Sequence, residues 1–185
     1  MQATLGSGTP LRPVLAKVIS PMPPPGPKHE CYDNSVNLLH DLCKDLRLHD
    51  ELRFVAFDQQ HGCGVHFVIE DAISVYDRTN MIPEHPHVTR VAKRSYWEDC
   101  GRASEGDHIV RLTIDQYNVY VVIMRVVWGR NGTQSLFHIF TQMKLVAALW
   151  DQGGAHESMK ERVCRIAHRL CPRGVDVNEI ISDLL

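Results

Sequence analysis

Three residues that together can break an amide bond occur in order along the chain: Cys31, His66 and Asp77. A cysteine thiolate is a strong nucleophile, and an imidazole beside it can hold the proton and later deliver it to a leaving group. A carboxylate on the far side of the imidazole fixes the tautomer and the orientation of the ring. The three residues predict a hydrolase in which Cys31 is the nucleophile, His66 the base and Asp77 the orienting group.

Cys31 lies where a helix is expected to begin. The apolar residues that follow it recur at three- and four-residue steps, and Asp33 and Asn34 precede them as capping residues do. The dipole and the free N–H groups at a helix N-terminus stabilise a thiolate, and the same N–H groups can stabilise an oxyanion. We therefore expect a helix over 31–46 with the nucleophile at its start.

His66 and Asp77 are expected on two neighbouring strands of one hairpin. Because side chains alternate between the two faces of a strand, a two-residue turn keeps His66 and Asp77 on one face. A turn at 71–72 places them directly opposite each other, and a turn at 70–71 places them diagonally, within roughly 5–8 Å between Cβ atoms. A three-residue turn would put them on opposite faces and exclude the triad.

The remaining pattern predicts an α+β fold in which the N-terminal helix carries Cys31 and packs on an antiparallel sheet. The expected strands with short alternating or apolar runs span residues 52–57, 65–69, 73–76 and 108–114. A run rich in Val and Ile predicts a long strand over 118–128. Asn131-Gly132 then predicts a hairpin, with a return strand over 135–142 that could instead begin a helix. C-terminal helices are expected over 145–150, 156–170 and 175–184, and a short helix is expected near Tyr96.

The first 28 residues differ in composition from the rest of the chain. Five prolines between positions 21 and 27 exclude a helix or a central strand, which predicts an extended arm or linker over 1–28. Residues 29–185 are long enough to bury the core of a single domain. The formal net charge of -2 gives no sign of a nucleic-acid or membrane partner. The apolar runs are too short for a transmembrane helix, and the N-terminus lacks a signal-peptide layout.

The order of the three residues resembles the papain-like superfamily of cysteine hydrolases. In that pattern a Cys at a helix start is followed by a His at a strand start and an Asp at the end of the next strand. The matching segments are Cys31-Tyr-Asp-Asn-Ser, Gly64-Val-His66-Phe-Val and Val75-Tyr-Asp77-Arg-Thr. They lie within residues 29–80 and are similar to compact members: bacterial toxin and effector proteases, glutamine deamidases, and the amidohydrolase that acts on N-terminal glutamine.

The resemblance implies a papain-like fold and attack on an amide bond of a protein or peptide substrate, as a protease or a deamidase, with no cofactor and no metal. It also implies an effector or toxin that is cytoplasmic, or delivered into a target cell without a cleavable signal peptide. An inhibitor, immunity or chaperone protein would be a further partner. Two positions depart from the pattern: Pro25 stands where papains carry an oxyanion-binding Gln, and Tyr32 directly follows the nucleophile. A second oxyanion donor would have to come from elsewhere.

A metal site is one alternative. His61, Cys63 and His66, joined by His29 or Cys31, supply residue types that bind zinc. The spacing His-x-Cys-x-x-His is more compact than the common structural zinc motifs, and the chain offers no evident second ligand pair.

A non-catalytic interaction module is the other alternative. Cysteine is often a small buried hydrophobe, and Asp77 followed by Arg78 could simply begin a turn. The apolar segment 117–128 and the proline-rich arm would then serve binding.

Overall fold

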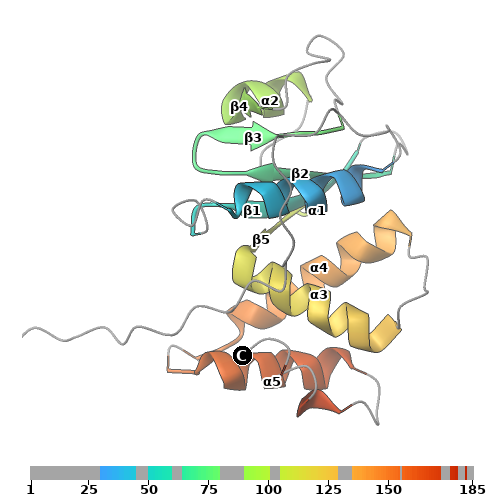
Figure 1. The fold of residues 1–185 in the computed structure, drawn as a ribbon, viewed down its shortest axis with the longest axis vertical. Helices are drawn as coiled ribbons and strands as arrows, with labels where there is room; N and C mark the ends of the chain where they lie inside the picture. The colour runs from blue at the N-terminus through green and yellow to red at the C-terminus, as the bar shows by residue number, and fades with distance from the viewer. Residues whose placement is uncertain are drawn as a thin grey trace, which may run out of the picture.

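In the part of the chain that the computed structural model describes, five antiparallel strands and five helices form an α+β fold (Figure 1). The structure describes residues 30–44, 50–59, 64–79, 90–100, 105–128, 135–154, 156–171, 176–178 and 182. The strands are β1 (Arg53–Asp58), β2 (Val65–Glu70), β3 (Ser74–Tyr76), β4 (Arg90–Ala92) and β5 (Ile109–Thr113). Their order in the sheet is β4-β3-β2-β1-β5, so the first four strands form a meander and β5 adds to the free side of β1.

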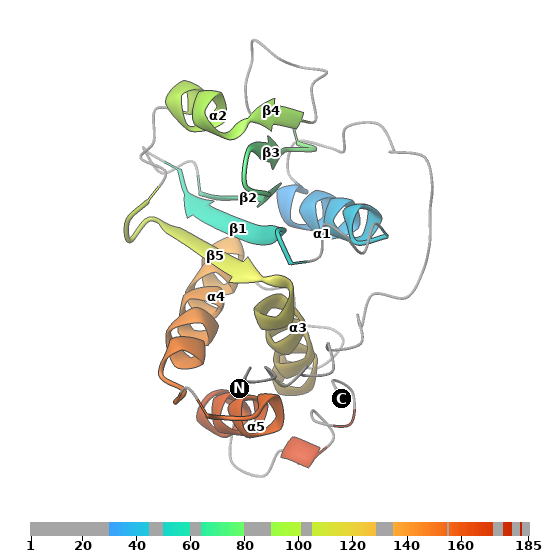
Figure 2. The same cartoon turned by 90° about the vertical axis from the view of Figure 1, so that its left-hand side faces the viewer.

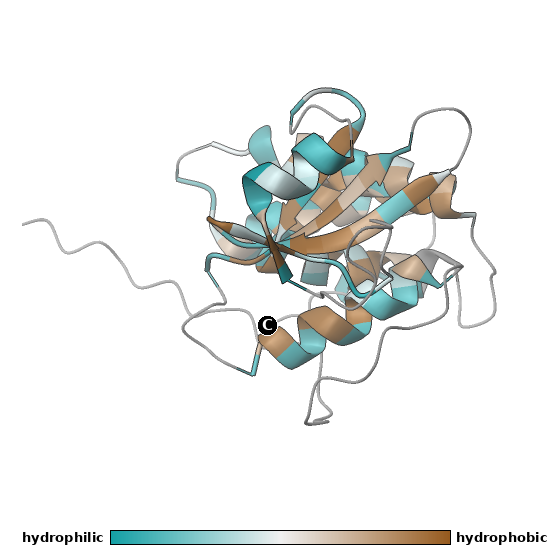
Figure 3. Ribbon diagram, turned by 90° about the horizontal axis from the view of Figure 1, so that it is seen from above, coloured by the Kyte–Doolittle hydropathy of each residue, from teal (hydrophilic) through white to brown (hydrophobic). Residues whose placement is uncertain are grey.

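The sheet is covered on both faces. On one face Phe54, Phe67 and Leu112 are fully buried in the large core that includes residues of α1 (Cys31–Leu42), α3 (Ile114–Trp128), α4 (Leu136–Asp151) and α5 (Met159–Leu170). On the other face a smaller cluster that includes Val55 and Val68 packs against α2 (Lys93–Asp99). Figure 2 shows α2 beside β3 and β4, while α3 and α4 lie beyond β5. Figure 3 shows apolar residues, in brown, along the strands at the centre.

Helix α1 begins at Cys31, as expected from the sequence, and ends at Leu42; residues 45–49 lie outside the described part of the chain. Its buried residues recur at three- and four-residue intervals, and they are Cys31, Asn34, Ser35, Leu38 and Leu39. This spacing places them on one face of the helix, which packs against the sheet at β2.

Strands β2 and β3 are joined by a two-residue turn, as predicted, but the turn lies one residue beyond the later of the two expected positions, 71–72. Glu70 pairs with Val75, and the Asp71 N–H donates to the Ser74 carbonyl at 3.0 Å, which makes 72–73 the turn. The Asp71 carboxylate holds this turn by accepting the backbone N–H groups of Ile73 at 2.8 Å and Ser74 at 2.6 Å. The parity that places His66 and Asp77 on one face is preserved.

The strand predicted over 118–128 is wrong, because this segment is helix α3. Thr113 Oγ1 accepts the N–H of Gln116 at 3.2 Å while Gln116 Oε1 accepts the N–H of Thr113 at 2.8 Å, a capping box at the start of the helix. The side chains from Asn118 to Met124 are almost all buried. A helix buried on most sides has the same continuous apolar sequence as a buried strand, and periodicity alone does not distinguish them.

The hairpin predicted at Asn131-Gly132 is also wrong, since the elements before and after it are both helices. The return strand over 135–142 is instead the first part of α4, which was the alternative for this segment, and Ser135 caps it by accepting the His138 N–H. The helix predicted over 145–150 belongs to the same α4. Helix α5 begins at Met159, three residues later than expected, after a capping box of Ser158 and Glu161.

Two predicted segments lie outside or largely outside the described residues: the arm over 1–28 and the helix over 175–184. The short helix expected near Tyr96 is α2. None of the helices in the described part of the chain is long and apolar enough to cross a membrane.

Candidate active site

His66 and Asp77 lie in contact on the face of the sheet that α2 covers. His66 is the second residue of β2, Asp77 follows directly after β3, and the His66 Nε2 lies 2.9 Å from the Asp77 Oδ2. Because a carboxylate can only accept, Nε2 carries the proton of this hydrogen bond. The predicted proximity of these two side chains is therefore confirmed.

Asp77 is held by two further donors. The Tyr96 hydroxyl of α2 donates to the same oxygen, Oδ2, at 2.8 Å, and the Thr79 N–H donates to Oδ1 at 2.8 Å. Burial alone would raise the pKa of Asp77, but His66, Tyr96 and Thr79 lower it below its ordinary value. Burial, together with the Asp77 charge, raises the pKa of Tyr96 well above its ordinary value, so the tyrosine stays a neutral donor.

Cys31 approaches His66 from the opposite side of the sheet. Its side chain belongs to the large core, yet it lies close enough to the His66 imidazole to raise the pKa of that imidazole. The thiol also donates to the Val65 carbonyl, with a sulfur–oxygen distance of 3.7 Å. Because Nε2 of His66 is bound to Asp77, Nδ1 is the nitrogen that can face the thiol. The structure thus brings together all three residues that the sequence singled out.

The early end of β3 makes this approach possible. Tyr76, the last residue of β3, pairs with Ile69, so the next carbonyls on this side of β2, those of Phe67 and Val65, lie beyond the end of the partner strand. Helix α1 lies along this edge of β2. Ser35 donates to the Phe67 carbonyl at 2.7 Å, one helical turn after Cys31 contacts Val65. The helix start is therefore fixed beside the start of β2.

The charge of His66 follows from its neighbours. Burial lowers the pKa of His66, but the Asp77 carboxylate and the Cys31 side chain raise it more strongly, to about 9. At neutral pH the imidazole is therefore protonated. Phe57 packs edge-on against the imidazole with 5.4 Å between ring centroids, and Trp97 packs against Phe57 at 5.1 Å, which keeps water away from the His66–Asp77 bond.

Backbone donors for an oxyanion are present at the start of α1. The first hydrogen bond of the helix runs from the Asn34 N–H to the Glu30 carbonyl at 2.8 Å, and the Glu30 side chain makes no capping bond. The helix itself therefore leaves the N–H groups of residues 31–33 available. They lie next to Cys31, where the negative charge of a tetrahedral intermediate would develop.

The three candidate residues are deeply placed. Cys31 is 5% exposed, His66 is 2% exposed and Asp77 is 3% exposed. A substrate reaching the thiol therefore has to present a narrow group to a small exposed area. This favours small acyl or carboxamide groups over bulky ones at the point of attack.

The other predicted ligands of a metal site do not join this cluster in the described structure. His29, His61 and Cys63 lie outside the described residues. Among the residues that the structure describes, no group of three His, Cys, Asp or Glu side chains is arranged to hold a metal ion. Most of the residues that would form the alternative metal site therefore lie outside the described part of the chain.

Sequence reasoning did not identify Tyr96, Thr79 or Ser35 as parts of the site. Asp77 followed by Arg78 is typical of the start of a turn, and Thr79 is the residue whose N–H such a turn directs to the carboxylate. Ser35 could have been found from its position one turn after Cys31. Tyr96 carries no such signal, because its distance from Asp77 depends on how α2 folds back over the sheet.

No family model, no curated protein and no solved structure matches this chain.

Proposed function

We propose that this protein is a cysteine hydrolase that attacks an amide bond of a protein substrate. One observation carries the proposal: the Cys31 side chain lies close enough to the His66 imidazole to raise its pKa, and the imidazole is hydrogen-bonded to the Asp77 carboxylate. The start of α1 beside His66 and the unused N–H groups next to the thiol support it. The order of a helix-borne Cys, a strand-borne His and a following Asp is similar to papain-like enzymes, which supports the same reaction class.

The proposed reaction starts from the Cys31 thiolate and the protonated His66. The thiolate attacks the amide carbonyl carbon, and the N–H groups at the start of α1 stabilise the oxyanion that forms. His66 donates its proton to the amide nitrogen as the C–N bond breaks, which leaves a thioester on Cys31. A water molecule then loses a proton to His66 and attacks the thioester, releasing a carboxylic acid and restoring the starting state. Asp77 keeps the imidazole oriented throughout.

Because so little of Cys31 is exposed, deamidation of a glutamine side chain is favoured over cleavage of a peptide bond in the backbone. A carboxamide at the end of a long side chain reaches a thiol that is 5% exposed more readily than an extended chain does. In that reaction the leaving group is ammonia and the product is glutamate. We also propose that the protein acts as an effector or toxin and that an inhibitor, immunity or chaperone protein binds it.

The test is turnover of a denatured protein mixture by the full chain, measured as released ammonia and as new N-termini. The wild type is expected to release one of the two products, and the Cys31→Ala and His66→Ala variants are expected to release neither. Cys43→Ala is the matched control, because Cys43 caps the C-terminal end of α1, at the opposite end of the helix from Cys31. Equal product release by wild type and Cys31→Ala would overturn the proposal.

A non-catalytic domain is the second candidate, and the burial of the three side chains is the observation that favours it. In that case the His66–Asp77 pair is a structural ion pair and Cys31 a packing residue. Its proposed binding surface on 117–128 does not fit, because the described side chains of this segment are largely buried. If the thiol of Cys31 proves inert to small alkylating reagents, this candidate is favoured.

A further inference from the structure

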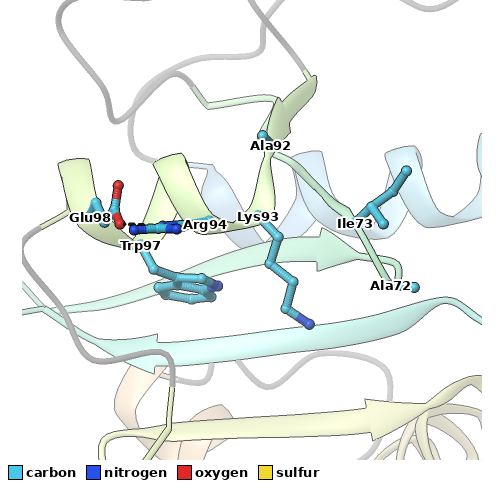
Figure 4. A pocket seen from close by; sticks show the side chains of 7 residues that line it. All are labelled: Ala72, Ile73, Ala92, Lys93, Arg94, Trp97 and Glu98. Carbon is cyan, nitrogen blue, oxygen red and sulfur yellow. Dashed lines mark hydrogen bonds and ion pairs between the residues drawn. The ribbon is translucent and has the colours of Figure 1, made fainter.

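A pocket with a cavity volume of about 570 Å³ lies where α2 meets the hairpin of β2 and β3, and it contains no residue of the triad. Its walls include Trp97 and Lys93 of α2 and the turn residue Ile73. Figure 4 shows the indole of Trp97 and the side chain of Lys93 lying side by side over the sheet, with Ile73 on the other side of the lysine.

The pocket contains a buried hydrogen-bond donor that lacks an acceptor. Trp97 is 4% exposed, and among the described residues its Nε1 has no hydrogen-bond partner. A buried indole N–H normally finds an acceptor, because leaving it unpaired costs free energy. In Figure 4 the indole nitrogen points toward the Lys93 side chain, so an acceptor placed beside Lys93 would also reach Trp97.

Beside the pocket, two cationic side chains share one carboxylate. Glu70, which is 1% exposed, is paired with both Arg111 and Lys93. Arg111 contacts both oxygens of the carboxylate, through Nε to Oε1 and through the terminal nitrogen to Oε2 at 3.4 Å, while the Lys93 ammonium makes a single contact at 2.9 Å. Arg111 alone can neutralise Glu70, so the Lys93 ammonium is a surplus cation that can turn to a ligand without leaving a buried carboxylate unpaired.

The pocket also offers an apolar rim. Ile73 is 70% exposed, one of the most exposed large apolar side chains in the described structure. An apolar ligand group beside an acidic one would cover Ile73 while its charge meets Lys93.

We propose that this pocket binds an acidic peptide segment of a protein partner, whose carboxylate accepts from the Trp97 indole N–H and the Lys93 ammonium while a neighbouring apolar side chain packs on Ile73. The chemistry that selects the ligand is a charge-assisted hydrogen bond combined with apolar contact. The site does not depend on the proposed hydrolase activity, because none of its residues belongs to the triad.

The test is a titration of the ¹⁵N-labelled full chain, carrying Cys31→Ala, with the terminally blocked peptide Ala-Leu-Glu-Leu-Ala. The indole N–H signal of Trp97 is assigned by its loss in Trp97→Phe. We expect this signal to shift on binding and the peptide Ala-Leu-Gln-Leu-Ala to bind about tenfold more weakly, because it lacks the charge. Lys93→Gln should weaken binding of the Glu peptide by a similar factor, whereas Lys160→Gln, an equal charge change at an exposed site on α5, should not.

Any of four outcomes would overturn the proposal. The Trp97 signal remains unmoved at saturating peptide, or it moves equally with the Gln peptide, or Lys93→Gln binds the Glu peptide as the parent does. An equal shift with sodium acetate or inorganic phosphate at the same concentration would show a simple anion site and would also overturn the peptide ligand. Because activity is not measured, none of these results depends on whether the protein is a hydrolase.

Discussion

The Ser35 hydroxyl donates to the Phe67 carbonyl at 2.7 Å, and both residues are fully buried. This hydrogen bond ties α1 to the edge of β2 at a point where β3 has already ended. Because Ser35 lies one helical turn after Cys31, the same contact fixes the position of Cys31 along β2, beside His66. A backbone edge that another strand would normally occupy thus becomes the attachment point of the helix.

Removal of the hydrogen bond between Ser35 and Phe67 should destabilise the folded protein. Ser35→Ala leaves a buried carbonyl without its donor, so we expect the free energy of unfolding to fall by about 1–3 kcal/mol. Urea titration followed by circular dichroism measures the change. Ser95→Ala makes the same substitution at an exposed helical site on α2 and should change stability by less than about 0.5 kcal/mol. Equal effects of the two substitutions would contradict the role given to Ser35.

The Tyr96 hydroxyl should position Asp77 for the triad. We expect Tyr96→Phe to lower stability by about 1–3 kcal/mol and to slow alkylation of Cys31 several-fold, since Asp77 then holds the imidazole less firmly. Tyr76→Phe is the matched control, because Tyr76 donates to the buried Asp71 at 2.7 Å away from the triad. Tyr76→Phe should lower stability by a similar amount to Tyr96→Phe and leave the alkylation rate of Cys31 unchanged. Slowing by both variants would indicate a purely structural effect.

The His66–Asp77 pair predicts a pH dependence of stability. Burial lowers the pKa of His66, but Asp77 and Cys31 raise it from 6.5 to about 9. A group with a raised pKa in the folded state contributes stability fully below its unfolded value, and this contribution disappears as the pH rises through the folded value. We therefore expect the wild type to exceed His66→Gln by about 3 kcal/mol near pH 6 and the gap to close by pH 10. A gap that is constant from pH 6 to 10 would refute a protonated His66.

At acidic pH, Asp77 gives the stability a pH dependence opposite to that of His66. Burial raises the pKa of Asp77, but His66 and its other donors lower it below the ordinary value. Its contribution is present above the unfolded pKa and is lost as the pH falls through the folded one. Unfolding measured from pH 5 down to pH 2 should therefore show a steeper loss of stability for wild type than for Asp77→Asn.

Site-mapped alkylation separates the candidate nucleophile from the other thiols. Burial raises the pKa of Cys43 to about 11, and burial together with nearby carboxylates raises that of Cys100 to about 11. At pH 6.5 these two thiols are almost entirely protonated and unreactive. Iodoacetamide should therefore modify Cys31 at least about tenfold faster than either, although Cys31 is the least exposed of the three. Peptide mapping by mass spectrometry measures the rates, and His66→Ala should remove the difference.

The sequence by itself determined the features that depend on local periodicity. The helical spacing after Cys31 places this residue at the start of a helix, and strand parity places His66 and Asp77 on one face for any two-residue turn. That parity held even though the turn is at 72–73, one residue beyond the later expected position and two beyond the earlier one. The spacing of Thr113 and Gln116 is also typical of a helix start, and these residues form the capping box of α3, although one such motif does not decide how the apolar run after it folds.

Only the tertiary structure decided how these local pieces meet. The apolar run of α3 fits a buried strand or a buried helix equally well, and the core around it selects the helix because its side chains are covered on most sides. Likewise, the short length of β3 is what leaves the edge of β2 open to Ser35 and Cys31, and the path of α2 is what brings Tyr96 to Asp77. Such contacts join residues far apart in the sequence, and their free energy depends on the packing of the whole fold rather than on local spacing.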